Sequence, residues 1–575
     1  MLNFYDFEVF KEDWLVVIIN PLEHNEKVIV NSREELEEYY ESHKNQIWVG
    51  YNSREYDSYI LKGILCDFEP KEINDFIIKY GNRGYMFSSL FRQIKLNDYD
   101  VMSGARVGLK TLEGFMGNDM RETSVPFDID RKLTDEEIQD TIKYCKHDVK
   151  QTMEVFLNRK GDFDTHMNLI KVFNLPMSYI SKTQAQLIGS ILGASRRNYD
   201  DEFDIKIPNT LRLNKYKEVL EWYLDLQNRR YKDDKSKKVQ LDIMVADCPH
   251  VFAWGGVHGA LNKYNGEGVY LMADVASLYP SLMIVYNYFS RSIKNPQKYI
   301  DIYKTNLEMK KTNHKDRPVY KLICNTTYGC MKDKSNPLYD PQMANNICIA
   351  GQLLLLDLIE KLEPHIERLI QSNTDGILLK LKSMNDFNII DDIVYEWEAR
   401  TGLQMEFDLY RKVFQKDVNN YVILPYEKDK KVKKKGAYTK DLSDLDYDLP
   451  IVNEALVNYM VNDVSIEDTV YSCRDYRKFQ KIVKVSNKYI CGFHNGERLK
   501  DKTFRVFASK RKNDDIIGKV KLKNHVEVIE KFANTPLHCF IDNSEVKNKK
   551  PPRYLDKDWY IDLAIERLRQ YGIDY

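Results

Sequence analysis

Acidic side chains recur in the first quarter of the chain at spacings that could gather divalent cations. Asp6 and Glu8 lie two residues apart in the apolar run 2–10, and Asp57 and Asp148 follow further along. Carboxylate oxygens are the ligands that hard cations such as Mg²⁺ prefer, and two such cations promote phosphodiester hydrolysis by ionising water and neutralising phosphate charge. The four acids therefore predict a two-metal phosphodiesterase site.

Strands and a helix must bring the first three acids together. The run 2–10 predicts a buried strand, and residues two apart on a strand point to the same face, so Asp6 and Glu8 would share one. Residues 47–49 predict a second strand, and Asp57 stands at the start of the amphipathic helix that follows. A single exposed acid is usually only solvated, so the prediction rests on the set.

The fourth acid lies on another predicted helix. Thr134 and Glu137 form the capping-box pattern that opens a helix. On this helix Tyr144 and Asp148 are four residues apart and share a face. We therefore expect the Tyr144 hydroxyl to orient the water that attacks the phosphodiester.

Two further acids predict a second metal site downstream. Asp274 ends the apolar strand that begins at Leu271, and burying an acid there costs free energy unless a cation compensates it. Asp375 lies in the string 373–376, between apolar runs that predict a hairpin with a tight turn. Its neighbour Asn373 can accept hydrogen bonds but brings no negative charge.

A polar and aromatic stripe lies between these two acids in sequence. Arg317, Lys321, Asn325 and Tyr328 are four, four and three residues apart, so one helix face would carry all of them. Pro318 fits the first turn of that helix. The positive charges of Arg317 and Lys321 are suited to binding a triphosphate. The competing interpretation is that this helix face is basic only because it is exposed to solvent.

In order and form, these segments resemble the motifs of family B DNA polymerases that carry a 3′-5′ exonuclease. The exonuclease forms D-x-E, N-x2-3-(F/Y)-D and Y-x3-D, followed by polymerase motifs A, B and C, match residues 6–8, 52–57, 144–148, 271–281, 321–329 and 373–375. Motif B has Thr326 in place of Ser, and Asn373 replaces the first Asp of D-T-D.

The resemblance implies the metal ligands of both sites. Each site would hold two Mg²⁺ (or Mn²⁺) ions. The exonuclease ligands would be Asp6, Glu8, Asp57 and Asp148, and the polymerase ligands would be Asp274, Asp375 and the carbonyl of Val275.

The same resemblance implies the residues that bind nucleotide and DNA. Tyr279 would close the sugar pocket and select deoxynucleotides. The triphosphate and the new base pair would meet Arg317, Lys321, Asn325 and Tyr328. The DNA contacts would be Asn52 and Tyr56 at the 3′ end, the loop with Gly255 and Gly256, and Tyr421 of a K-x-Y motif whose missing Lys is replaced by Lys416 or Lys435.

The implied fold is α/β (α+β multidomain), with an RNase H-like exonuclease domain followed by a right-hand polymerase of palm, fingers and thumb. The expected boundaries are 1–165 for the exonuclease, 166–290 and 332–430 for the palm, 291–331 for the fingers, and 431–575 for the thumb and C-terminal region.

Composition limits the partners and the location of the chain. The net charge of −1 over 575 residues excludes a uniformly basic nucleic-acid binder, so DNA contacts must come from local patches. The candidate patches are 428–435, 510–512, 519–523 and 547–553. Nine scattered cysteines without a C-x-x-C pair favour a reduced, cytoplasmic setting, which is the host cytoplasm if the chain is phage-encoded. We expect a monomer without a membrane-spanning run.

The leading hypothesis is a DNA-templated DNA polymerase that extends a primer with dNTPs and proofreads it. The chain between motifs A and B, and between B and C, is too short for the two insertions of protein-primed relatives. A compact phage-type replicase related to that branch is therefore expected, working on primer-template DNA with partners such as a helicase or a single-strand-binding protein. The alternatives are an exonuclease with an impaired polymerase site and a non-catalytic DNA-binding scaffold.

Overall fold

The computed structural model describes residues 1–102, 106–427 and 429–575, so Lys428 of the first predicted basic patch lies outside the described residues. The chain separates into two compact units that contain both helices and strands, in agreement with the predicted α/β class. Unit 1 comprises Met1–Thr183, Leu442–Ile451 and Ser472–Tyr560, and unit 2 comprises Gln184–Asp441, Val452–Tyr471 and Ile561–Tyr575. Residues 431–575, expected to form the thumb and C-terminal region, are thus divided between both units. The four-domain boundaries stay a prediction.

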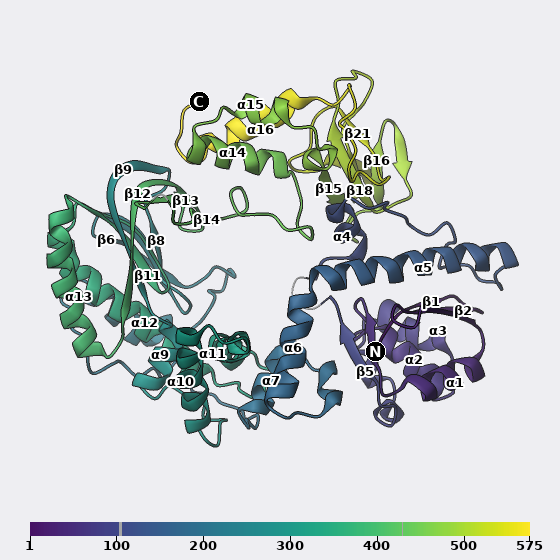
Figure 1. The fold of residues 1–575 in the computed structure, drawn as a ribbon, viewed down its shortest axis with the longest axis horizontal. Coiled ribbons are helices and arrows are strands. Elements are labelled where there is room, and N and C mark those ends of the chain that lie inside the picture. The colour runs from purple at the N-terminus through teal and green to yellow at the C-terminus, as the bar shows by residue number, and fades with distance from the viewer. Residues whose placement is uncertain (103–105, 428) are drawn as a thin grey trace. The chain divides into compact units, whose positions relative to one another are not determined.

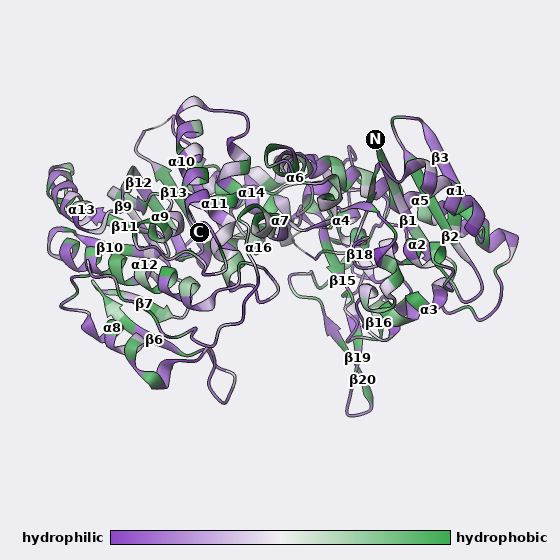
Figure 2. Ribbon diagram, turned by 90° about the horizontal axis from the view of Figure 1, so that it is seen from below, coloured by the Kyte–Doolittle hydropathy of each residue, from purple (hydrophilic) through white to green (hydrophobic). Residues whose placement is uncertain are grey.

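Unit 1 begins with a mixed sheet in the order β3-β2-β1-β4-β5. Its strands are β1 (Leu2–Val9), β2 (Trp14–Asn20), β3 (Asn25–Val30), β4 (Ile47–Gly50) and β5 (Asn97–Asp100). The first three are antiparallel, whereas β4 and β5 run parallel to β1. The central strands are apolar (Figure 2), and Val16, Ile18 and Trp48 are fully buried in the core. This core fixes the register that directs Asp6 and Glu8.

The N-terminal part of unit 1 also contains helices (Figure 1). They are α1 (Arg33–His43), α2 (Asp57–Leu65), α3 (Pro70–Asn74), α4 (Leu109–Met116), α5 (Asp135–Asn158) and α6 (Lys160–Val172), with the short helices η1 (Asp75–Lys79), η2 (Gly84–Met86), η3 (Ser89–Arg92) and η4 (Met177–Ser181). The predicted capping box is confirmed, because Thr134 accepts a hydrogen bond from the Glu137 N–H and Glu137 accepts one from the Thr134 N–H. Helix α5 therefore begins where the sequence predicts.

The C-terminal part of unit 1 contains two small antiparallel sheets. They consist of β15 (Lys481–Lys484), β18 (Thr503–Ala508) and β21 (Cys539–Ile541), and of β17 (Glu497–Leu499), β16 (Cys491–His494), β19 (Gly518–Lys523) and β20 (Val526–Lys531). The fully buried Arg505 on β18 joins this part to α4, since its guanidinium donates to the carbonyls of Gly114, Asn118 and Ser544. Burial lowers the pKa of Arg505 to about 10.

Unit 2 is built on one large sheet in the order β14-β13-β12-β9-β11-β10-β8-β7-β6. The strands are β6 (Gln240–Val245), β7 (Cys248–Ala253), β8 (His258–Ala260), β9 (Tyr264–Val275), β10 (Arg368–Asn373), β11 (Gly376–Leu381), β12 (Met405–Asp417), β13 (Asn420–Pro425) and β14 (Lys433–Lys435). All neighbouring strands in this sheet are antiparallel. The predicted hairpin of β10 and β11 is confirmed, with a turn at Thr374 and Asp375.

The helices of unit 2 include α11 (Arg317–Lys332), which carries the polar stripe, and α10 (Gln297–Thr312), which packs against it. The others are α7 (Gln184–Ile191), α8 (Lys217–Leu224), α9 (Leu278–Val285), α12 (Pro341–Leu362) and α13 (Phe387–Thr401), together with most of α14 (Pro450–Asn462), α15 (Ile466–Ser472) and α16 (Lys557–Arg569), and the short helices η5 (Leu226–Asn228), η6 (Glu363–His365) and η7 (Met384–Asp386).

One helical stretch among the described residues, Pro341–His365, is long and apolar enough to cross a membrane. The expectation that no such run exists is therefore wrong on length and composition. The whole of its apolar window is buried inside the protein, as in the central helix of a protein core.

Candidate active sites

Unit 1 brings the four predicted exonuclease acids together. Asp6 and Glu8 project from β1, Asp57 begins α2, and Asp148 lies on α5. Burial raises the pKa of Asp6, and the charges of Asp57, Glu8 and Asp148 raise it further. Burial likewise raises the pKa of Asp57 to about 8, although its Oδ1 accepts a 3.1 Å hydrogen bond from the Phe7 N–H.

This cluster has the donor chemistry for hard cations. Buried carboxylates that repel one another are costly unless a cation stands between them, and oxygen donors suit Mg²⁺ or Mn²⁺. Asp6 and Glu8 can offer oxygen ligands and Cys145 a sulfur within 4.8 Å of one another, whereas Asp148 groups with Glu113 and His147 instead. The residues present therefore fit a divalent ion in this site.

Lys110 on α4 is a member of this site that the sequence did not indicate. Its Nζ lies 2.5 Å from Asp148 Oδ1, 3.0 Å from Glu113 Oε1 and 4.7 Å from the ring centroid of Tyr144. Burial alone would lower the pKa of Lys110, but the charges of Asp148 and Glu113 raise it. His147 Nε2 lies 3.4 Å from Glu113 Oε2, so the ammonium is held within a polar network.

A cavity of about 470 Å³ opens beside Glu8. Tyr56 lines it, and its hydroxyl donates to Asn74 Oδ1 at 2.8 Å. Lys71 and Lys79 line the same cavity together with Asp75 and Asp128, and Lys71 Nζ lies 3.0 Å from Asp75 Oδ1. Of the two predicted contacts to a DNA 3′ end, Tyr56 therefore faces a space of nucleotide size. Asn52 is not among the described residues that line this cavity.

In unit 2 the sheet places the two predicted polymerase acids side by side. Asp274 lies opposite Gly376 in the pairing of β9 with β11, directly beside Asp375 in the turn. The Val275 N–H donates to the Asp375 carbonyl at 2.7 Å, which fixes the end of β9 to this turn. Burial raises the pKa of Asp274, Lys433 lowers it, and the charge of Asp375 raises it.

Gly376 makes this close approach feasible. A Cβ atom at position 376 would lie 1.8 Å from Asp274 Oδ1 and 3.1 Å from the Ala273 carbonyl oxygen. Any larger residue would therefore displace the Asp274 carboxylate. The two oxygen-donor side chains at this point fit a divalent cation as well.

Lys433, which belongs to the basic patch 428–435, lies beside these acids. Its Nζ lies 3.4 Å from Asp274 Oδ2 and 2.7 Å from Met272 Sδ, reaching across from β14. On the same strand, Lys435 pairs with Tyr421 of β13, and its charge acts on His258. Both lysines therefore lie on the face of the sheet that carries the acids.

The K-x-Y motif keeps its tyrosine near the acids. Burial raises the pKa of Tyr421 to about 12, and the charges of Asp274 and Asp375 contribute. Lys416 instead lies with its Nζ 4.9 Å from the ring centroid of Tyr438. Of the two substitutes for the missing lysine, Lys435 is thus the one beside Tyr421.

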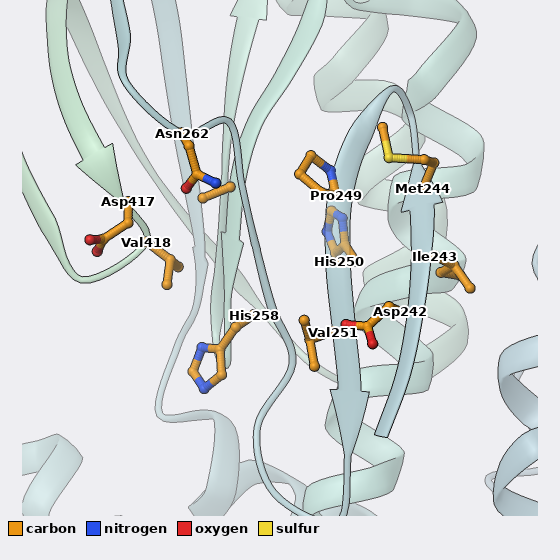
Figure 3. A pocket seen from close by; sticks show the side chains of 11 residues that line it. Asp242, Ile243, Met244, Pro249, His250, Val251, His258, Asn262, Asp417 and Val418 are labelled. Carbon is orange, nitrogen blue, oxygen red and sulfur yellow. The ribbon is translucent and has the colours of Figure 1, made fainter. Parts of the chain in front are cut away.

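Asn373 lies opposite His258 in the pairing of β10 with β8 and hydrogen-bonds to its side chain. Burial lowers the pKa of His258, although the Asn373 hydrogen bond opposes this shift. His258 also lines a cavity of about 550 Å³ together with Asp242 and with Asp417 at the end of β12 (Figure 3). Asn373, the first residue of the motif 373–375, therefore contacts the neutral side chain of His258 rather than a second acid.

The nucleotide-binding candidates come from α9 and α11. The rings of Tyr279 and Tyr328 stack with centroids 4.0 Å apart and an interplanar angle of 28°. Lys321 and Asn325 are exposed on the same helix as Tyr328, whereas Arg317 is partly buried. The structure thus joins the aromatic members of the two predicted motifs and leaves the polar ones open to a ligand.

The Gly255–Gly256 loop lies against both groups. The Gly255 carbonyl accepts hydrogen bonds from Cys348 and Gln352 of α12. The Cys348 side chain in turn hydrogen-bonds to Tyr328. A Cβ atom at position 256 would lie 2.7 Å from Thr374 Oγ1, so this glycine permits the loop to contact the turn that holds Asp375.

Comparison with known proteins finds little. No protein-family model matches the sequence, and no curated protein matches it either. Among solved structures, the chain is similar to the family B DNA polymerase from the hyperthermophilic archaeon Pyrobaculum calidifontis, at 13% sequence identity and a TM-score of 0.40. That match covers 99% of this chain and 78% of the other. A likeness this distant assigns no function, so function must be inferred from the residues of the two sites.

Proposed function

We propose that the chain is a DNA-templated DNA polymerase of the family B type with a separate 3′-5′ proofreading exonuclease. The observation that carries the proposal is the strand register of unit 2, which sets Asp274 beside Asp375 at one end of the sheet. Two carboxylates in this position, together with the stacked pair Tyr279 and Tyr328 and the exposed Lys321, suit the transfer of a nucleotide from a triphosphate.

In synthesis, each group would have a definite task. Lys321 and Arg317 would bind the triphosphate, and the Tyr279 ring would exclude a ribose 2′-hydroxyl. Lys433 or Lys435 would hold the primer end, in place of the lysine missing from the K-x-Y motif. The primer 3′-hydroxyl would then attack the α-phosphate, and pyrophosphate would leave.

In trimming, the buried acids of unit 1 would hold the divalent ions that neutralise the scissile phosphate, with Tyr56 beside the terminal nucleotide. Tyr144 would orient the attacking water, because its hydroxyl hydrogen-bonds to Asp148. The proposed cofactor for both sites is Mg²⁺ or Mn²⁺, held by the acids named for each. When bound, such ions activate the attacking oxygen and neutralise charge on the phosphate.

The proposed subtype is a compact phage-type replicase that extends an ordinary nucleic-acid primer. The short connection from α9 to α11 and the direct passage from α11 through α12 to β10 support this subtype, because neither leaves room for an additional subdomain. A helicase or a single-strand-binding protein would be its natural partners.

Incubation with a 5′-labelled primer on a single-stranded template, with and without dNTPs, tests the proposal. We expect longer products with dNTPs and shortened primers without them. Shortening under both conditions would favour a nuclease with an impaired polymerase site, for which Asn373 gives a specific reason. No change under either condition would favour a non-catalytic scaffold. Asp391→Asn, an exposed acid on α13, is a control that should keep both activities.

A further inference from the structure

A cavity of about 570 Å³ in unit 1 is lined mainly by cations, and neither proposed site uses it. Two segments, 474–477 and 547–550, form its lining, and Asp475 is its single acidic residue. The cationic residues are Arg474, Arg477, Lys547, Lys549 and Lys550. The second segment belongs to one of the basic patches that the sequence indicates.

Two of the five cationic side chains, Arg477 and Lys547, are held in place by hydrogen bonds or ion pairs. The Arg477 guanidinium donates to the Phe115 carbonyl at 2.6 and 3.0 Å and lies 2.7 Å from Asp444 Oδ1. Lys547 Nζ lies 2.6 Å from Glu154 Oε1. Asp475 uses its carboxylate to accept the Arg477 N–H at the start of η8 (Tyr476–Phe479).

The other three cations remain open to a ligand. Arg474, Lys549 and Lys550 are exposed, and no described residue gives their side chains a hydrogen bond or an ion pair. Burial lowers the pKa of Lys557, and the positive charges of Arg474 and Lys510 lower it further. Like charges therefore crowd around Arg474. Crowded cations repel one another, and an anion in the cavity would relieve that repulsion.

The cavity has a rigid frame. The Tyr476 N–H donates to the Lys549 carbonyl at 3.0 Å, which joins the two lining segments, and the Val546 N–H donates to the Gly117 carbonyl at 2.9 Å. Both Gly117 and Phe115 lie at the C-terminal end of α4, the helix that carries Lys110. At about 1.5 Å per residue, this end is roughly 8 Å along the helix from Lys110.

We propose that this cavity binds phosphate groups, and that its occupant is the backbone of a DNA strand whose 3′ end lies in the exonuclease site. That the occupant is a DNA strand rests on the proposed function. A DNA strand and a free nucleotide both carry phosphate groups, so the cavity could bind either by the same contacts.

Binding of a fluorescent single-stranded oligonucleotide in EDTA, which prevents cleavage, tests the cavity directly. The variant Lys549→Ala/Lys550→Ala removes two open cations. Its matched control, Lys95→Ala/Lys500→Ala, removes two exposed lysines of the same unit that lie outside the candidate DNA patches. We expect several-fold weaker binding for the first variant, and a salt dependence shallower by about 1.4 in the slope of log K against log salt. The control should bind like the wild type.

Chemical acetylation of Lys549 and Lys550 in the wild-type protein, compared with and without ligand, shows whether the ligand covers these two lysines. Protection by the oligonucleotide but not by millimolar dATP supports the DNA backbone as occupant. Equal protection by dATP retains the phosphate site but overturns the DNA strand as its occupant. Unchanged affinity, an unchanged salt slope and no protection would overturn the proposal. Primer extension on the same preparation separates this failure from failure of the proposed function.

Discussion

Gly376→Ala offers a sharp test of how the synthesis site is built. The added Cβ would lie 1.8 Å from Asp274 Oδ1, whereas Cβ contacts below 3.0 Å essentially do not occur. The Asp274 carboxylate must therefore move by about 1 Å or more, which at a reacting centre costs on the order of 100-fold in rate. The fold should tolerate the change, because the clash falls mainly on the end of a side chain.

The assay is steady-state primer extension, with degradation of a single-stranded oligonucleotide measured in parallel. We expect synthesis to fall about 100-fold, or about 2.7 kcal/mol of transition-state stabilisation, with degradation unchanged. Gly161→Ala is the matched control, since a Cβ there has no neighbour within 4 Å. A folded Gly376→Ala protein that still extends primers within two-fold of wild type would refute the role given to Asp274.

Three further changes are predicted. Lys110→Met removes the ammonium beside Asp148, so hydrolysis of a labelled single strand should fall about 100-fold while extension persists; equal loss of both activities would indicate general misfolding. Tyr279→Ala opens the sugar pocket, and the ratio of rGTP to dGTP incorporation should rise at least about ten-fold; an unchanged ratio would remove this ring from the pocket. Arg505→Met leaves several buried carbonyl oxygens without a donor, so urea unfolding should report a loss of about 3 kcal/mol or more, whereas the exposed Arg498→Met should change little.

Local patterns in the sequence predicted the elements that hold the acids. The capping box at Thr134 and Glu137 sets the start of α5, and the apolar runs around Asp375 give the hairpin. Both signals are short-range, because a cap and a tight turn are specified by a few neighbouring residues. The sequence did not predict the pairing of Asp274 with that hairpin, because no local residue pattern specifies the register between strands that are distant in sequence.

The sequence did not place the two lysines beside the acids, because Lys110 and Lys433 contact partners 38 and 159 positions away. Lys433 was indicated only as part of the basic patch 428–435, and Lys110 was not indicated because an isolated lysine is usually solvated. The sequence did not predict the long apolar run of α12, because asparagines and glutamines interrupt it, yet all of this helix except Glu360 and Lys361 is buried. The division of residues 431–575 between two units likewise depends on contacts distant in sequence.

The central claim is that one chain holds two independent carboxylate sites, one for synthesis and one for trimming. The most direct measurement compares Asp375→Asn with Asp6→Asn in extension and degradation of the same labelled primer. The account predicts that Asp375→Asn abolishes extension and keeps degradation, and that Asp6→Asn does the reverse. Loss of both activities in each variant, with the fold intact, would contradict it.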